Sequence, residues 1–204
     1  MSRAKVQRKS TAIDMTAMCD VAFLLLTFFI LSAKPKTEDP VRAEVPASIA
    51  KETIPETDFA IITVGEGKVF YTIEGDDVRK ETIKAMGDQY KIAFTPEQIN
   101  TFAHTESFGV ALNVLPQFLS LTGPEKTDFK QTGMPVDTTE HNDLANWVLA
   151  TRKANVLLHN KEPQIAIKGD SKEEYPTIAK IIKTLQKQKV NKFSLITSLR
   201  TVTK

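Results

Sequence analysis

The chain of 204 residues contains few of the residue types that build metal or redox centres. It has a single cysteine, Cys19, so that no disulfide can form within the chain. Its three histidines, His104, His141 and His159, are far apart, and none has a cysteine or clustered carboxylates beside it at metal-ligand spacing. We therefore expect each histidine to be a surface or packing residue, and we expect neither a metal site nor a cofactor.

Motifs of enzymes and of nucleic-acid-binding proteins are also missing. No nucleophile elbow and no glycine-rich nucleotide motif is present, and the string GEGK at 65–68 lacks the glycine spacing and the following helix of a phosphate-binding loop. The formal net charge of +2 is too small to indicate a nucleic-acid partner. These absences argue against an enzyme and against a nucleic-acid-binding protein.

One segment is long and apolar enough to cross a bilayer: residues 13–33, IDMTAMCDVAFLLLTFFILSA. As a helix it would be about 30 Å long. Asp20 lies within it, although a charged Asp in mid-membrane costs about 2.5–3.5 kcal/mol, which the following Leu, Ile, Phe and Val residues offset by about 0.3–0.6 kcal/mol each. A carboxylate with so high an insertion cost normally has a function in proton or ion movement. The alternative is an Asp that merely pairs with a polar group on a neighbouring helix.

Four basic residues and no acidic residue precede this segment on its N-terminal side: Arg3, Lys5, Arg8 and Lys9. This bias predicts that residues 1–12 are a cytoplasmic tail and that the chain from Lys34 onward faces the periplasm or an equivalent outer compartment. A cleaved signal peptide fits less well, because a small-x-small cleavage site is missing before Lys34. We expect a single-pass membrane protein.

The rest of the chain divides into a linker and one domain. Residues 34–57 contain scattered prolines and charges without apolar periodicity, which predicts an extended linker. Residues 58–204 begin with a predicted hairpin and a helix to about Tyr90, and they end with a strand, an amphipathic helix opened by Pro176 and a last strand. This order predicts an α+β domain, a small sheet with helices on one face.

Residues of about 90–160 interrupt this plan. Thr95 and the Pro-Glu pair after it predict a helix start, and a longer helix opened by Thr139 is expected to include Trp147. The apolar stretch between them, VALNVLPQFLSL, is too short and too broken by Pro116 to span a membrane. We interpret the region as a helical insertion, or as a pair of helices packed on the domain; alternatively, its apolar residues form a partner surface.

The membrane segment carries a specific likeness to a known family. The residues from Asp14 to Val21, DMTAMCDV, followed by an aliphatic and aromatic run, resemble the signature of the ExbD/TolR biopolymer-transport family. That signature is roughly Asn, an aliphatic residue, Thr, Pro, two apolar residues, Asp and Val. The chain departs from it at Asp14, where the family commonly has Asn, and at Ala17, where it has Pro.

Two further segments support the resemblance. The second half of the family's periplasmic domain is similar to the C-terminal part of this chain. That part contains the strand at 165–170, Tyr175, the amphipathic helix and the strand ending at Thr197. Linker residues also weakly resemble the family's Val-Asp-Leu-Pro motif and are a candidate partner-binding segment: Val41, Val45 and Pro46.

The resemblance implies an inner-membrane, proton-driven motor subunit. Two copies would sit inside a ring of ExbB- or TolQ-type subunits, where Asp20 would take a proton from one side and release it to the other. The periplasmic domains would pass the resulting motion to a TonB- or TolA-type protein that serves the outer membrane. A TolR-like role in envelope integrity, a passive membrane-anchored adaptor and a secreted binding protein remain as alternatives.

Two details of this mechanism can be placed on the sequence. On a helix Thr16, Asp20 and Thr27 share one face, so that the threonines could orient the carboxyl group or a water beside it. Alternatively, each threonine bonds to a carbonyl of its own helix. The last strand, Lys192 to Leu199, is expected at a sheet edge, where a second copy of the chain can pair to form a homodimer.

Overall fold

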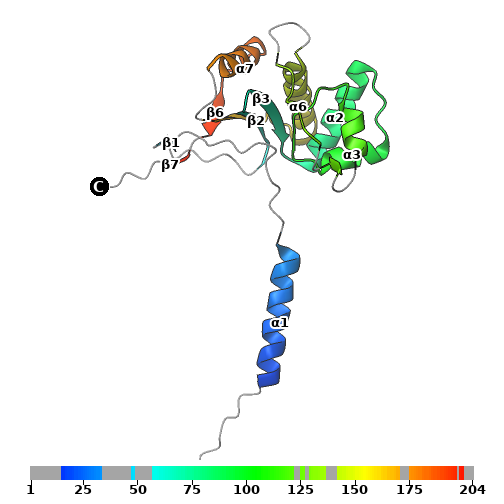
Figure 1. Ribbon diagram of the computed structural model, residues 1–204, viewed down its shortest axis with the longest axis vertical. Coiled ribbons are helices and arrows are strands. Elements are labelled where there is room, and N and C mark those ends of the chain that lie inside the picture. The colour runs from blue at the N-terminus through cyan, green and yellow to red at the C-terminus, as the bar shows by residue number, and fades with distance from the viewer. Residues whose placement is uncertain are drawn as a thin grey trace, which may run out of the picture. The chain divides into compact units, whose positions relative to one another are not determined.

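The structure is a computed structural model, and it describes the residues 15–33, 47–48, 57–121, 125–126, 129–136, 142–170, 175–196 and 198–199. The chain divides into two compact units, Met1–Glu38 and Asp39–Lys204. The first unit contributes helix α1 (Met15–Ser32), and the second contributes the sheet and the other labelled helices (Figure 1).

A five-stranded mixed sheet, in the order β4-β3-β2-β5-β6, is the framework of the second unit. Its strands are β2 (Phe59–Gly65), β3 (Lys68–Ile73), β4 (Ser107–Phe108), β5 (Gln164–Gly169) and β6 (Phe193–Ile196). β2 pairs antiparallel with β3 and parallel with β5, and β5 pairs parallel with β6. The first strand of the domain in sequence is therefore the central strand of the sheet.

The predicted hairpin of β2 and β3 is confirmed, and its two-residue turn explains the register. Glu66 and Gly67 both have positive φ, 55° and 70°. Positive φ at both central residues is the backbone of a type I′ turn, whose twist matches that of the paired strands. Gly67 takes this conformation without the steric penalty of a side chain.

The helices of the second unit pack into one hydrophobic core with one face of the sheet. They are α2 (Asp76–Tyr90), α3 (Pro96–Ala103), α4 (Leu115–Ser120), α6 (Asp143–His159) and α7 (Tyr175–Lys187). Because side chains alternate along a strand, Ala60, Ile62 and Val64 of β2 all point into this core and are fully buried. The predicted α+β domain beside a single apolar helix is confirmed.

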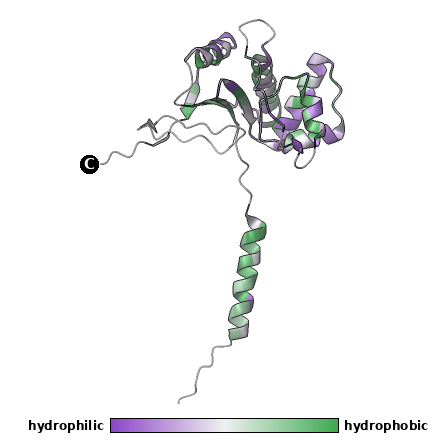
Figure 2. Cartoon of the chain, in the orientation of Figure 1, coloured by the Kyte–Doolittle hydropathy of each residue, from purple (hydrophilic) through white to green (hydrophobic). Residues whose placement is uncertain are grey.

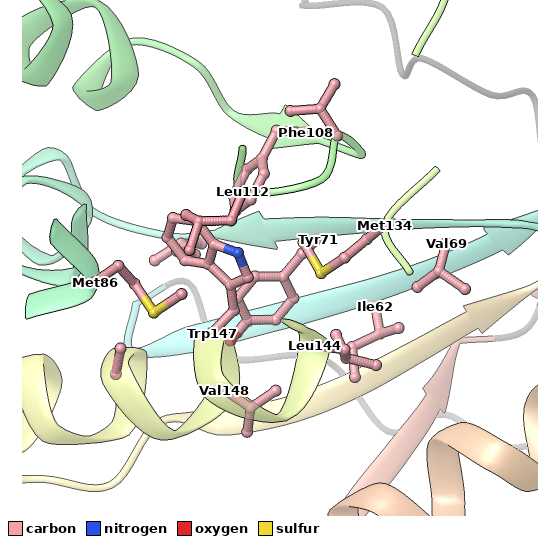
Figure 3. Packing of buried hydrophobic residues seen from close by; sticks show 14 of the residues in the cluster. Ile62, Val69, Tyr71, Met86, Phe108, Leu112, Met134, Leu144, Trp147 and Val148 are labelled. Carbon is pink, nitrogen blue, oxygen red and sulfur yellow. The ribbon is translucent and has the colours of Figure 1, made fainter. Parts of the chain in front are cut away.

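Trp147 of α6 lies at the centre of this core (Figure 3). Its ring stacks on Phe102 with centroids 5.6 Å apart and meets the edge of Phe108 at 4.8 Å. The apolar stretch before α6 is also buried, at Val110, Leu112, Leu115, Phe118 and Leu119. Most apolar residues of the region 90–160 therefore build the core, whereas Val156, Leu157 and Leu158 near the end of α6 are 42%, 71% and 44% exposed.

Local capping signals fix where the helices of this region begin. The predicted start of α3 is confirmed: the Thr95 hydroxyl accepts from the Gln98 backbone N–H at 3.2 Å, and the Thr95 N–H donates to Gln98 Oε1 at 2.9 Å. α6 begins after Asn142, whose side-chain oxygen accepts from the Ala145 N–H at 3.3 Å. The expected start at Thr139 lies outside the described residues.

The C-terminal strand predicted as one element is divided into two. β6 lies at the edge of the five-stranded sheet, as expected. The next strand, β7 (Ser198–Leu199), pairs in parallel with β1 (Ala47–Ser48) in a separate two-stranded sheet. Residues from the predicted linker and from the end of the chain thus lie side by side.

Candidate functional site

Among the described residues, α1 is the one helix long and apolar enough to cross a membrane. Its 18 residues span about 27 Å at 1.5 Å per residue. None of them is buried, and hydrophobic residues follow one another along most of its length (Figure 2). A helix that is apolar on all sides needs an apolar environment.

Asp20 is the only charged residue of α1 and the sixth residue of the helix. Within the part of the chain that the structure describes, its carboxylate makes no hydrogen bond or ion pair. A carboxylate in hydrocarbon is tolerated only if it is protonated or if water or a polar partner reaches it. In such an environment, the charge on the Asp20 carboxyl group would determine whether the group needs water or a polar partner beside it.

The two threonines lie on the same side of α1 as Asp20 by helical spacing. The Thr27 hydroxyl donates a hydrogen bond to the Leu24 carbonyl at 2.9 Å, so that its proton is bound within its own helix. The same oxygen keeps lone pairs that can accept from a protonated carboxyl group or a water. Thr16 is one turn before Asp20. The candidate linker residues Val41, Val45 and Pro46, and also Asp14, lie outside the described residues.

A second group of titratable side chains gathers at the beginning of α2. The His159 ring bridges two carboxylates: Nδ1 is 2.5 Å from Asp58 Oδ1, and Nε2 is 3.1 Å from Asp77 Oδ2. These hydrogen bonds, first that of Asp58 and then that of Asp77, raise the pKa of His159 above its ordinary value. Close by, His104 Nδ1 is 3.6 Å from Asp76 Oδ2.

Sequence reasoning missed this group because nothing along the chain connects its members. Asp58 and His159 are 101 residues apart, and only the folded sheet and α6 bring them together. His141 lies outside the described residues. Within the described ranges, no three His, Cys, Asp or Glu side chains are grouped so that they could hold a metal ion.

Comparison with known proteins gives one match. The model of a protein family described as "Biopolymer transport protein ExbD/TolR" matches residues 7–200, which include α1 and the whole sheet. No curated protein and no solved structure matches the chain. The match extends across residues 90–160 as well as across the segments whose motifs resemble the family.

Proposed function

Since the chain belongs to the ExbD/TolR family of biopolymer transport proteins, it is a transport subunit, and we propose that it is the proton-carrying subunit of an inner-membrane motor. The family is anchored in the inner membrane and works with ExbB/TolQ-type membrane subunits. In this proposal such subunits form a ring around two copies of α1, and the proton-motive force energises TonB-dependent transport at the outer membrane. Neither catalysis nor a cofactor is required of the chain.

The observation that carries the proposal is the single carboxylate of an otherwise uncharged membrane-length helix. When Asp20 is protonated, it is neutral and α1 can face an apolar surface. When Asp20 loses its proton, its charge favours a position beside water or polar groups of the ring. Proton transfer to and from Asp20 would therefore change which surface α1 prefers, and this change can be converted into motion.

Replacement of Asp20 by Asn tests the proton-carrying role, because it keeps the shape and removes the titratable proton. We expect the Asp20→Asn variant to insert and to copurify with the ring, while energy-dependent uptake falls to the level of cells without the protein. The matched control is Asp14→Asn, the same chemical change six positions earlier, which should retain most of the uptake. Wild-type uptake by Asp20→Asn would favour the passive adaptor.

The same variant separates the ExbD-like role from the TolR-like alternative. Cells that carry Asp20→Asn are assayed for TonB-dependent uptake and for resistance to detergents, which reports on envelope integrity. Loss of uptake with intact resistance supports the ExbD-like role, and the reverse supports the TolR-like role.

The proposed topology has a cytoplasmic N-terminus and a periplasmic C-terminus. A reporter that is active only in the periplasm should be active when fused after Lys204 and inactive when fused at Lys9. The opposite result would place the domain in the cytoplasm and remove its route to a TonB- or TolA-type partner.

We also propose that two copies meet near the C-terminal edge of the sheet. Native mass spectrometry of the purified complex should show two copies, and cysteines introduced at Ser198 or Thr201 should crosslink them. A single copy in the complex would refute the homodimer, whereas missing crosslinks alone would exclude only this contact.

A further inference from the structure

The contacts of His159 join three segments of the domain that are distant in sequence. Asp58 directly precedes β2, Asp77 lies in the first turn of α2, and His159 is the last residue of α6. The side chains are only partly accessible: 34% of His159 and 19% of Asp58 is exposed, whereas Asp77 is 58% exposed. A protonated imidazole can donate to both carboxylates at once, one from each ring nitrogen.

The backbone at Asp58 makes these contacts important for the beginning of the domain. Asp58 has a φ of 59°, in the left-handed region that is uncommon for residues other than glycine. Its carbonyl accepts from the Gln164 N–H at 2.8 Å, which starts the pairing of β2 with β5. The side-chain contact with His159 therefore restrains Asp58 at the point where the chain enters its central strand.

We propose that Asp58, His159 and Asp77 form a proton-operated clasp, which fastens the entry of β2 to α2 and α6 while His159 carries a proton and loosens when the proton is lost. A neutral imidazole has one N–H, so one carboxylate loses its donor and both lose the neighbouring positive charge. Asp58 and Asp77 then face a ring that no longer balances their charges. The state of the clasp therefore depends on the pH of the compartment that contains the domain.

The pH response of the clasp depends on His159, because most of the other charged groups near it have partners of their own. Lys161 lies close enough to Asp58 to favour its charged form. Asp76 forms an ion pair with the buried Arg79, with Oδ1 3.3 Å from Nη1, and it also contacts His104. Glu162 forms an ion pair with Arg152, with Oε1 3.0 Å from Nη2. Apart from His159, the one histidine among these groups is His104. His104 contacts Asp76 and not the clasp, which makes it the matched control.

The pH window follows from the directions of the shifts. The raised pKa of His159 means that its contribution is complete below about pH 6.5, the ordinary histidine value, and is lost as the pH rises through the higher folded value. The pKa of Asp58 is held below its usual range, first by the hydrogen bond with His159. For Asp77, burial opposes the shift, but bonds from the Val78 N–H and His159 outweigh it. The clasp is therefore complete between about pH 4 and 6.5.

Hydrogen exchange of the full chain in detergent tests the clasp. Protection factors, corrected for intrinsic exchange, are compared at pH 5.5 and 8.5 for peptides at the start of β2 and α2. We expect wild-type protection to fall at pH 8.5, by at most about tenfold for each unit by which the pKa of His159 is raised. The His159→Gln variant should show low protection at both pH values, and His104→Gln should behave as the wild type.

Wild-type protection that is independent of pH, or a pH step that survives in His159→Gln, would overturn the proposal. If His159→Gln does not fold, two other variants decide it through the His159 pKa, measured by NMR. Asp58→Asn and Asp77→Asn should each lower that pKa, with the larger effect from Asp58→Asn because its contact is shorter. An unchanged His159 pKa in both variants would show that no clasp exists.

Discussion

The helices α1 and α6 have nearly equal lengths, 18 and 17 residues, but they differ in how many of their residues are buried. α1 buries none of its residues, whereas α6 buries seven, with Trp147 among them. The difference arises from the residues themselves: α6 combines buried apolar residues with charged residues such as Arg152 and Lys153, whereas α1 is apolar along most of its length and contains one charged residue. α6 completes the core of the domain, and α1 exposes an apolar surface of the kind that lipid or another protein can cover.

The two helices also differ in whether their polar side chains have hydrogen-bond partners. Asn142 at the beginning of α6 caps the helix and donates from its amide to the Thr184 hydroxyl at 2.9 Å, while His159 at its end bridges two carboxylates. The carboxylate of Asp20 has no such partner within the described residues. The polar side chains at the two ends of α6 therefore stabilise the fold through their hydrogen bonds. The Asp20 carboxylate contributes no such bond within the described residues, so that it is free to gain or lose a proton without breaking one.

The largest effect that would test this comparison is expected from Trp147→Ala. Removal of a fully buried Trp that packs on Phe102 and Phe108 should lower the free energy of unfolding of the domain by about 3–5 kcal/mol. Urea unfolding followed by far-UV circular dichroism measures it, since the variant lacks the chain's one tryptophan. A loss below about 1 kcal/mol would mean that α6 is peripheral to the core.

A smaller effect is expected from Asn142→Ala. The variant loses the cap of α6 and leaves the Thr184 hydroxyl without its donor, so the free energy of unfolding should fall by about 0.5–2 kcal/mol. The same urea titration measures it. Asn142→Ser is the matched control, because Ser keeps a capping oxygen and should recover most of the cap.

The domain should also be less stable at pH 8.5 than at pH 6. His159 has a raised pKa in the folded protein, so its contribution to stability disappears as the pH rises through that value. The urea midpoint of the wild type should therefore decrease over this range, and that of His159→Gln should change less. Equal decreases in both proteins would assign the pH dependence to other groups.

The smallest effect is expected from Phe28→Ala in α1. Phe28 contacts Phe29 within its own helix and is 63% exposed, so the urea unfolding of the domain should change by less than about 0.5 kcal/mol. Copurification with the ring subunits is the assay in which this variant should show a defect. A large change in the free energy of unfolding of the domain would contradict this expectation.

Local patterns were sufficient to predict much of the fold. The helix start at Thr95, the hairpin of β2 and β3 and the amphipathic helix α7 each depend on neighbours within a few residues. All three predictions are confirmed, and Ile181 and Leu185 on the inner face of α7 are fully buried. In the same way, the uniform apolarity of α1 and its one Asp are visible in a single window of sequence.

Features that depend on contacts distant in sequence could not be predicted. The bridge of His159 to Asp58, the pairing of Ala47 with Ser198 and the central position of Trp147 all require the complete topology of the sheet. The division of the last strand had no signal either, because KFSLITSL alternates without a turn residue. For Asp20 the sequence predicts a titratable group within an apolar helix, and the described residues offer its carboxylate no partner.

The central position of β2 has a mechanical consequence. A pull on the chain that precedes Asp58 acts along β2, which is paired over six residues with β3 on one side and over six with β5 on the other. The hydrogen bonds between strands run across the direction of such a pull. They are therefore loaded together in shear and do not open one after another from an end. This geometry favours the transmission of tension that arrives along the chain before Asp58.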